Sequence, residues 1–558
     1  MDFVLTLHSH LPWVLHHGRW PHGSDWLCEA AVDTYLPLVA ALEQLEHQRV
    51  ASPVTIGVTP ILANQLAHRD FAHELETFLG QRLKACDEAV IAFRQSGEEH
   101  LIPLAGYWRA RLGRLRRLLR RHDHDLIGAL RHQAQAGRVE LMSSAATHGF
   151  LPLLARDESI RLQLITGRRE HRRLFGNDPA GCWVPECAYR KAGHWAPLAS
   201  APGQRYRPGL ETHLSAAGFE YFHTDSHMAE AGQSLGLYGE TDFVDGIREP
   251  HEMALDTVYP RSPYRTYQVL PPSGAPVAVL VRDPVSSLRV WSRYHGFPGD
   301  AGYLEFHKIR WPGGLKLWRV TGADVDLGGK QPYDHNIARA RVHRHAAEFV
   351  TLLLSVSSAA KPLGGDLIAA PFDTELFGHW WYEGVDWLAD LYRALGRQDS
   401  LRPVTATGHL ARRTGRVSAR VPISLAEGSW GANGDYSMWL NPQTEWTWER
   451  LWGLEERFWN QARRDLPDCP PDRRPAWEQA TRELLLAQSS DWQFIISTGA
   501  AGDYAERRFR EHCDALDFLL QGLSDGTIEA VTRKAAELLR LDDPFPDPLP
   551  AVIAALEG

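Results

Sequence analysis

The sequence predicts an α/β fold built around a parallel sheet or barrel, because short apolar runs alternate with helical patterns along most of the chain. Each apolar run has the length of a buried strand and little internal polarity, which is typical of strands covered on both faces. Helical patterns separate several of the runs, for example over residues 33–48, 68–98 and 157–174. The predicted strands are residues 3–7, 54–58, 139–142, 182–184, 220–223, 277–281 and 367–370.

Polar and ionisable residues follow directly after most of these strands. In a βα barrel the carboxyl ends of all strands open onto one mouth, and active sites are built there. One such residue would carry little weight, but several in register with the strands form a pattern. They are His8 and His10 after the first strand, His148 after the third, Glu186 after the fourth, Arg282 after the sixth, and Asp373 and Glu375 after the seventh.

Two stretches interrupt the alternation, and the last part of the chain lacks strands. Residues 188–217 contain several prolines and predict an insertion over the mouth, while the Gly- and Pro-rich residues 227–276 predict a long surface loop. We therefore predict a catalytic domain over residues 1–411 and an α-helical C-terminal domain over residues 412–558. The helices predicted in the second domain are residues 448–465, 475–489, 504–520 and 528–541.

Composition narrows the function classes. The 558 residues carry a net charge of −9 from 60 basic and 69 acidic side chains, which does not favour nucleic acid or an anionic membrane as a partner. Six dispersed cysteines form no disulfide or zinc pattern, and no apolar run is long enough to cross a bilayer, so we expect a cytoplasmic protein. Seven arginines between residues 109 and 121 predict an amphipathic helix, with a solvated face favoured over a phosphate-binding one.

Glu186 and Asp373 are the strongest candidates for catalysis. Each follows a predicted strand in apolar or aromatic surroundings, with Trp183 near one and Phe372 beside the other. Cleavage of a glycosidic bond needs two carboxyl groups, one to attack the anomeric carbon and one to protonate the leaving oxygen. Apolar surroundings help to keep the second group protonated, because they disfavour its charged form. The alternative for each residue is a structural role, in an ion pair or as a helix cap.

His8 and His10 at the end of the first strand allow a different chemistry. Two histidines two residues apart on a strand point the same way and can share a metal ion, as at the start of barrel amidohydrolases. His148 and Asp373 are available as further ligands, but no lysine or paired histidine completes the set, and Glu375 is interpreted as a surface or structural residue. The alternative for His10 and His148 is hydrogen bonding to sugar hydroxyls, since a neutral imidazole offers one donor and one acceptor.

Tryptophan is the most informative part of the composition. Twenty tryptophans are many for this length, and sugar-binding clefts use flat aromatic faces to pack against pyranose rings. The segment from Trp430 to Trp439 predicts an exposed loop that displays aromatic faces, because Gly431 and Gly434 allow a tight turn that a core position would not need. The tryptophans that follow have helical spacing and predict core packing: Trp446, Trp448, Trp452 and Trp459.

Five segments together resemble glycoside hydrolase family 57, and within it the α-1,4-glucan branching enzymes. The resemblance runs nearly end to end, and it implies a distorted (β/α)7 barrel with a helical insertion and a helical C-terminal domain. It also implies that the protein uses no metal and no organic cofactor. The segments are His8-Ser-His10-Leu-Pro12, Thr147-His148-Gly149, Trp183-Val-Pro-Glu186-Cys-Ala-Tyr189, Ala370-Pro-Phe-Asp373-Thr-Glu-Leu-Phe-Gly-His379-Trp, and the loop from Trp430 to Trp439.

The resemblance implies roles for individual residues. The nucleophile of the family corresponds to Glu186 and its acid/base to Asp373. Branching enzymes of the family carry a loop tyrosine that closes over the site. Tyr238 is the candidate here, followed by a longer segment than expected, and a tyrosine that only packs the loop is the alternative. Contacts with an α-glucan such as amylose or a glycogen-like polysaccharide are expected for His10, Trp26, His148, Arg282, Trp291, Trp430, Asp435 and Trp439.

The reaction that the resemblance implies is a double displacement, which cleaves an α-1,4 linkage and transfers the chain to a 6-hydroxyl in glycogen-type synthesis. With water as the acceptor the protein would be an α-amylase, and with a 4-hydroxyl it would be a 4-α-glucanotransferase. All three reactions share the first step, so the acceptor site and the exclusion of water decide among them. A non-catalytic glucan-binding protein descended from such an enzyme is the remaining alternative.

Overall fold

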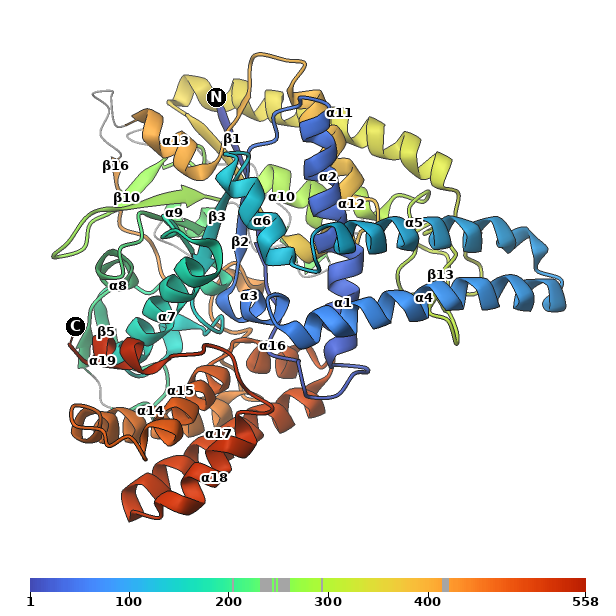
Figure 1. The fold of residues 1–558 in the computed structure, drawn as a ribbon. Coiled ribbons are helices and arrows are strands. Elements are labelled where there is room, and N and C mark those ends of the chain that lie inside the picture. Colours follow the sequence, from blue (N-terminus) through green and yellow to red (C-terminus); the bar gives the residue numbers. More distant parts are fainter. Residues whose placement is uncertain are drawn as a thin grey trace.

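A computed structural model describes residues 1–202, 205–230, 243–244, 247–248, 261–292, 295–413 and 421–557. Seven strands run parallel in neighbouring positions, and a bridge between Arg282 and Ala369 joins the last to the first, which closes a barrel (Figure 1). Each predicted apolar run corresponds to one of these strands, so the predicted fold class is confirmed. In spatial order they are β14 (Leu367–Asp373), β1 (Asp2–Ser9), β2 (Val54–Val58), β3 (Val139–Ser144), β4 (Gly181–Trp183), β7 (Tyr221–Thr224) and β11 (Val277–Val281).

The strand register brings the predicted site residues to one end of the barrel. Every residue of β1 is buried, and its pairing with β14 sets His8 opposite Asp373. β3 and β4 also run parallel, so the turns that hold His148 and Glu186 leave the barrel at the same end. The mouth expected from the sequence is therefore a consequence of parallel strand direction.

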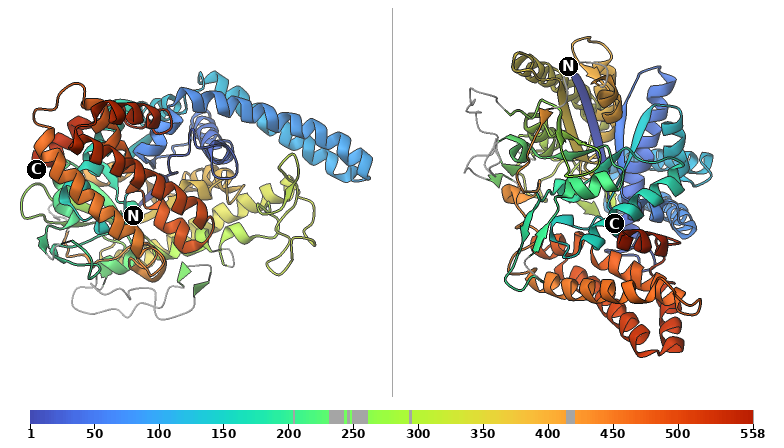
Figure 2. Two further views of the ribbon diagram at one scale, coloured as in Figure 1. Left: turned by 90° about the horizontal axis from the view of Figure 1, so that it is seen from below. Right: turned by 90° about the vertical axis from the view of Figure 1, so that its left-hand side faces the viewer.

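Helices pack around the outside of the barrel (Figure 2). Helix α7 (Asp157–Phe175) illustrates how their ends are stabilised: Asp157 and Glu158 lie in its first turn and Arg172 in its last, which suits the helix dipole. Gly176 then ends it with a φ of 87°, a left-handed value that glycine adopts without strain. The other helices of this part include α1 (Ser24–Ala30), α2 (Leu36–His47), α3 (Pro60–Leu66), α6 (Leu126–Gln135), α10 (Pro284–Trp291), α11 (His335–Ala360), α12 (Gly384–Leu395) and α13 (Ala406–Arg413).

Helices α4 (Arg69–Ser96) and α5 (Ile102–Arg121) form a long hairpin that projects from the barrel (Figure 1). The arginine-rich segment is α5, and Arg116 and Arg120 both pair with Glu76 of α4. Part of the basic face therefore joins the two helices of the hairpin. Within the described ranges, no helix is both long and apolar enough to cross a membrane.

Residues 188–217 contain more regular structure than was predicted. The guanidinium of Arg207 is buried, lies 4.9 Å from the centre of the Trp195 ring and donates to Asp157 at 2.8 Å. These contacts stabilise a hairpin whose strands are too short to show a period in the sequence, so the sequence analysis did not predict them. The elements are β5 (Gly193–Trp195), β6 (Arg205–Arg207) and α8 (Leu210–Ala216).

The predicted loop over residues 227–276 also holds regular elements. Strand β10 pairs antiparallel with β11, and its residues Tyr267 and Val269 are buried. Tyr238, the candidate loop tyrosine, lies outside the described residues, and its role stays a prediction. The short elements of this and later segments are α9 (Ser226–Glu230), β8 (Phe243–Val244), β9 (Ile247–Arg248), β10 (Tyr267–Val269), β12 (Ile309–Arg310), β13 (Leu315–Lys316), β15 (Arg402–Pro403) and β16 (Val421–Pro422).

The C-terminal helices form a layer on one side of the barrel (Figures 1 and 2). All four predicted helices are present with shifted ends, whereas α16 and α19 were not predicted because eight or nine residues give too short a pattern. Trp448, Trp452 and Trp459 are buried as predicted, and Trp446 is partly buried. The domain boundary after residue 411 stays a prediction. The helices are α14 (Glu445–Asp465), α15 (Arg474–Ala487), α16 (Asp491–Thr498), α17 (Gly502–Asp525), α18 (Ile528–Leu538) and α19 (Leu549–Glu557).

Helix α14 is fastened to the barrel by one buried face. The indole Nε1 atoms of Trp452 and Trp459 donate to oxygens of residues 153–159, each at 2.8 Å. Between them, a carboxylate oxygen of Glu455 accepts a hydrogen bond from the backbone N–H of Ala155 at 2.8 Å. The three side chains lie three and four positions apart and therefore share one face of the helix.

Replacing Glu455 by Ala is expected to destabilise the folded chain, because its carboxylate accepts hydrogen bonds from the backbone N–H of Ala155 at 2.8 Å and from the buried side chain of Gln488 at 2.7 Å, and both would be lost. An unsatisfied buried donor costs about 1–3 kcal/mol, which should lower the midpoint of thermal unfolding. Glu456→Ala, at the exposed neighbouring position of the same helix, is the matched control. Equal midpoints of thermal unfolding for the two variants would show that Glu455 does not hold α14 to the barrel.

Candidate active site

The carboxyl ends of the strands open into a cavity of about 770 Å³. Its lining comes from the turns that follow the strands, from the loop after residue 429, and from helices α16 and α17. The barrel mouth and the C-terminal helices therefore share one site. The sequence-predicted residues that line it are His10, Trp26, His148, Glu186, Arg282, Trp291, Asp373, Trp430 and Trp439.

Glu186 lies in an unusual backbone turn directly after β4. Glu186 and Cys187 have φ values of 60° and 49°, left-handed conformations that residues other than glycine rarely adopt. Each costs on the order of 1–3 kcal/mol and persists only where surrounding contacts hold it, as at many functional sites. The backbone N–H of Trp430 donates to the Glu186 carbonyl at 2.9 Å, so the loop after residue 429 helps to hold this turn.

The carboxylate of Glu186 has potential donors on two sides. The indole Nε1 of Trp430 donates to Oε2 at 2.9 Å, and Nδ1 of His148 lies 3.6 Å from Oε1. Burial raises the pKa of Glu186 to about 8 against the hydrogen bond from Trp430, and the charge of Asp373 adds to the rise. The Trp430 hydrogen bond favours the charged form, in which a carboxylate is a nucleophile.

Asp373 ends β14 and lines the same cavity. Burial raises the pKa of Asp373 to about 8, the charge of Glu375 adds to the rise, and the guanidinium of Arg282 opposes it. That guanidinium also contacts Asp225, with Nη1 lying 3.4 Å from Oδ2. A carboxyl group with a raised pKa keeps its proton near neutral pH and can act as a general acid. The pKa values of the two carboxyl groups are thus raised alike, and the hydrogen bond from Trp430 is the contact that favours Glu186 as the charged group and leaves the proton to Asp373.

Three histidines from the strand ends stack in the cavity. The ring centroids of His10 and His148 are 4.2 Å apart, and those of His8 and His148 are 4.9 Å apart. Burial lowers the pKa of His8 and of His148 well below the usual value, so both imidazoles are neutral. His8 and His148 approach through their Nε2 atoms at 3.0 Å, while His10 is hydrogen-bonded to Thr59 and Asp491. Nδ1 of His148 lies 3.1 Å from the hydroxyl of Ser490, so both ring nitrogens of His10 and of His148 already have protein partners.

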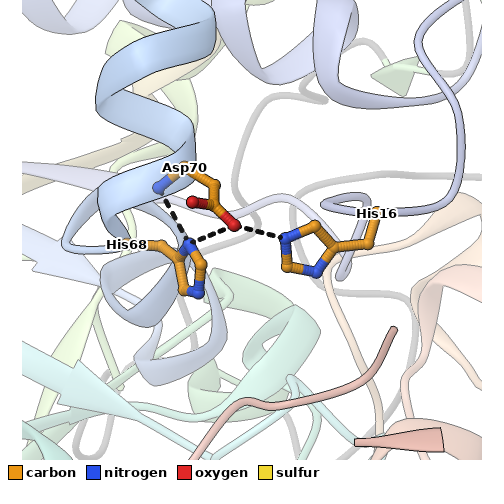
Figure 3. Close-up of side chains that lie close together, drawn as sticks. All are labelled: His16, His68 and Asp70. Atoms are coloured by element: carbon orange, nitrogen blue, oxygen red, sulfur yellow. Dashed lines mark hydrogen bonds and ion pairs between the residues drawn. The ribbon is translucent and has the colours of Figure 1, made fainter. Parts of the chain in front are cut away.

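The groups of three potential metal ligands that occur in the described residues lie away from this cavity. In one of them, both imidazoles point toward Asp70 (Figure 3), but Nδ1 of His68 already accepts the backbone N–H of Asp70 at 3.1 Å. A hydrogen bond to Asp543 raises the pKa of His68, so this group ties the start of α4 to the C-terminal segment. The metal site considered for His8 and His10 is not among these groups, which are His16, His68 and Asp70, and Glu483, His512 and Asp542.

Glu375 has a larger part in the site than its sequence position indicated. It is 7% exposed, accepts a hydrogen bond from the hydroxyl of Tyr35 and another from the backbone N–H of His10, and lines the cavity. Burial raises the pKa of Glu375 to about 7. A surface role is therefore wrong, whereas a structural role agrees with these contacts. Its place two residues after Asp373 was the available signal.

Five lining residues come from helices α16 and α17 and were missed in the sequence, and three of them carry a polar group or an aromatic ring into the cavity wall. Asp491 and Phe494 belong to α16, and Tyr504 belongs to α17. Oδ2 of Asp491 lies 2.8 Å from Nε2 of His10, across 481 positions of the chain. No local pattern marks a residue for a contact over such a separation, so these residues became visible only in the folded chain.

The loop from Trp430 to Trp439 packs against the protein instead of displaying both rings. Trp439 is 1% exposed and stacks on Phe150 with ring centroids 4.5 Å apart. A Cβ atom at Gly431 would lie 2.7 Å from the Trp439 ring, so this glycine permits close packing, and the predicted display of the Trp439 face was wrong. Asp435 is exposed, accepts a backbone hydrogen bond and is not among the lining residues, so the structure does not bring it to the site.

Aromatic rings surround the two carboxyl groups. Flat indole and phenyl faces pack well against the C–H faces of pyranose rings, and the half-buried position of the carboxyl groups limits their hydration. The arrangement can therefore hold a neutral, hydroxyl-rich chain and apply two carboxyl groups to one of its linkages. The aromatic lining consists of Trp26, Trp291, Trp380, Trp430, Trp439, Phe494 and Tyr504.

Comparison with known proteins identifies relatives over the whole chain. Residues 4–422 match the model of glycosyl hydrolase family 57, and residues 451–548 match the model of the 1,4-alpha-glucan branching enzyme C-terminal region. The chain is 38% identical to a 1,4-alpha-glucan branching enzyme of Thermococcus kodakarensis over 519 residues, which cover 91% of this chain and 72% of that protein.

Two solved structures show the same fold. A family 57 branching enzyme of Pyrococcus horikoshii has a TM-score of 0.87 at 33% identity, and the match covers 100% of this chain and 96% of that one. The alpha-amylase AmyC of Thermotoga maritima has a TM-score of 0.78 at 28% identity, with 98% and 97% covered. Since a branching enzyme and an amylase share this fold, the fold alone does not choose between the two reactions.

Proposed function

The chain belongs to glycoside hydrolase family 57, and we propose that it is a 1,4-α-glucan branching enzyme with Glu186 as nucleophile and Asp373 as acid/base. The observation that carries the choice of branching over hydrolysis is the C-terminal region. Residues 451–548 match the branching enzyme model, and the helices of this region line the cavity through Phe494 and Tyr504. The acceptor reaches the same cavity, so these helices are placed to influence which acceptor reacts.

In the first step Glu186 attacks the anomeric carbon of an α-1,4-linked glucose. The bond from this carbon to O4 of the next glucose breaks, and Asp373 gives its proton to that oxygen. The part of the chain on the reducing-end side therefore leaves with a free 4-hydroxyl. A covalent glucosyl ester with Glu186 remains. The pKa values of both carboxyl groups are raised, and the hydrogen bond from Trp430 supports Glu186 as the charged group, which leaves Asp373 as the proton donor.

In the second step a 6-hydroxyl of a glucan chain attacks the same carbon. Asp373, now a carboxylate, takes the hydroxyl proton, the ester bond to Glu186 breaks, and an α-1,6 linkage forms. Two inversions at one carbon retain the α configuration. An α-glucan such as amylose is the proposed substrate, with neutral histidines and aromatic rings as its contacts. All six cysteines are free thiols, which supports a reducing compartment, the cytoplasm, as the location.

The product profile on amylose tests the proposal. The purified protein is incubated with amylose, new reducing ends are measured, and the chains are then debranched enzymatically and sized. New short chains released only after debranching, with few new reducing ends, are expected for a branching enzyme. The control is the same incubation with heat-inactivated protein.

Each of the other possible results would identify a different activity. A rise in reducing ends alone would identify an α-amylase, and redistribution of linear chain lengths without branches would identify a 4-α-glucanotransferase. Glucan binding with no change in the products would favour a non-catalytic binding protein. Each of these results would overturn the proposed branching reaction.

A further inference from the structure

Arg190 carries a buried charge that no protein group within the described ranges satisfies. The residue is 4% exposed, and its three guanidinium nitrogens, Nε, Nη1 and Nη2, have no hydrogen-bond partner among the described residues. A guanidinium presents five N–H donors and keeps its charge in proteins. Burying such a group without acceptors is strongly unfavourable, so Arg190 calls for an acceptor other than the described protein groups.

Positive charge exceeds negative charge around this guanidinium. The nearby carboxylate of Asp157 is already used by a second buried arginine, because Arg207 donates to its Oδ1 from Nε at 2.8 Å and from Nη2 at 2.6 Å. Nε2 of His213 lies 3.7 Å from the same oxygen. Burial lowers the pKa of Arg190 to about 10, and the charge of Arg207 adds to the fall, while the charge of Asp157 opposes it. One buried carboxylate thus serves two buried guanidinium groups.

Two other polar neighbours leave the charge of Arg190 unbalanced. The charge of Glu427 also opposes the fall in the pKa of Arg190, but less than that of Asp157, and Glu427 is exposed. The hydroxyl of Tyr436 donates to the backbone carbonyl of Tyr189 at 2.6 Å. Glu427 is therefore the one rival counter-ion to be tested, and Tyr436 has no charge to offer.

We propose that the guanidinium of Arg190 binds a chloride ion where the start of α7, the β5–β6 hairpin and the loop after residue 427 meet. One unbalanced positive charge matches a monovalent anion. The nitrogens of Arg190 are shielded from solvent, which favours a small ion over a bulky sugar phosphate. A halide accepts several N–H donors at once, and hydrogen bonds between charged partners are the strong ones.

The segment that ends at Arg190 begins at the nucleophile. Glu186 lies four positions earlier, and the backbone between the two is fixed at both sides. The N–H of Tyr189 donates to the carbonyl of Gly428 at 2.9 Å, and the N–H of Gly428 donates back at 3.2 Å. The carbonyl of Arg190 accepts the N–H of Leu210 at 3.0 Å. Arg190 with its anion is therefore a positioning group for this segment. Binding of the anion is independent of the proposed function, and only its effect on turnover rests on it.

Thermal unfolding in sodium chloride and in sodium gluconate of equal ionic strength tests the site. Gluconate is too bulky to enter, whereas a ligand that binds only the folded chain stabilises it by mass action. The melting midpoint of the wild type should rise by roughly 1–3 °C for each tenfold increase in chloride above its dissociation constant. Arg190→Met should melt at the same temperature in both salts. In gluconate it should be at least as stable as the wild type, because an unpaired buried charge has been removed.

Three further variants separate this site from other causes. Lys191→Met makes the matched change at the exposed neighbouring position and should keep the full response to chloride. Arg190→Lys retains a charge and should keep a weaker response, which also provides the test if Arg190→Met does not fold. Glu427→Gln should keep the response, because Glu427 is not the partner of Arg190 in this proposal.

Bromide gives a direct view of the site, because it replaces chloride and scatters X-rays anomalously. Crystals of the wild type soaked in sodium bromide should show an anomalous peak beside the Arg190 guanidinium, and crystals of Arg190→Met should not. In gluconate, kcat of the wild type for branching of amylose should fall on the order of two- to tenfold with KM little changed, since misplacing a reacting group slows the chemical step. Arg190→Met should show equal kcat in the two salts.

Several results would overturn the chloride site. They are a wild-type midpoint that follows ionic strength alone, a chloride response that survives in Arg190→Met, and a bromide map without a peak at Arg190. A chloride-independent wild type together with a destabilised Glu427→Gln would show that Glu427 pairs with Arg190 in place of an anion. A wild type that forms no branches in either salt, but whose midpoint responds to chloride, would refute the proposed function and leave the anion site intact.

Discussion

Glu186→Gln is expected to abolish turnover of α-glucans while glucan binding persists. The amide keeps the shape of the side chain, and its oxygen can still accept the Nε1 hydrogen of Trp430, so the turn after β4 should keep its geometry. It cannot attack the anomeric carbon, and without the covalent intermediate kcat should fall on the order of 10³-fold or more. Branch formation on amylose measures kcat, and retardation in amylose-containing gels measures binding.

A structural defect has to be separated from a chemical one in this variant. Glu456→Gln makes the same chemical change at an exposed position of α14. Its turnover and its glucan binding should match those of the wild type. The thermal melting midpoint of Glu186→Gln should also be close to that of the wild type. A folded Glu186→Gln protein with wild-type turnover would remove Glu186 from the mechanism.

Asp373→Asn is expected to cause the second large loss, and its size should depend on the leaving group. General acid catalysis contributes roughly 10²–10⁴-fold, so cleavage of a glucan linkage should slow by that factor. Fluoride leaves without a proton, so the first step with α-maltotriosyl fluoride should be much less affected. Azide can attack the glucosyl ester without a general base, and it should accelerate the second step and yield an α-glycosyl azide. If cleavage of glucan and release of fluoride from α-maltotriosyl fluoride slowed equally, and azide had no effect, an acid/base role would be contradicted.

The pH profile gives an independent test of the same assignment. Burial raises the pKa of Asp373 to about 8, and the group is active as an acid only while it holds its proton. Burial raises the pKa of Glu186 to about 8 as well, so cleavage of glucan by the wild type should have its maximum near pH 8, and it should decline above this pH as Asp373 loses its proton and below it as Glu186 gains one. With Asp373→Asn and α-maltotriosyl fluoride, the decline at high pH should disappear and the decline at low pH should remain.

Much of the barrel could be predicted because its signals are local. A strand buried on both faces is an unbroken apolar run, and the residue after it lies at the mouth whatever the rest of the chain does. Glu186, His148 and Asp373 were found in this way. Short elements gave no such signal: the β5–β6 hairpin depends on Arg207 being buried against Trp195 and Asp157, which neither its length nor its period reveals.

Local pattern in the sequence thus decided the fold class, the strand ends and the catalytic candidates, and the resemblance of those segments indicated the family. The tertiary structure alone decided which other groups complete the cavity. Asp491 meets His10 across 481 positions, Trp439 is buried on Phe150, and Asp435 remains outside the site. The physical reason is that strand and helix patterns depend on neighbouring residues, whereas burial and contact at a shared cavity depend on how distant segments pack together.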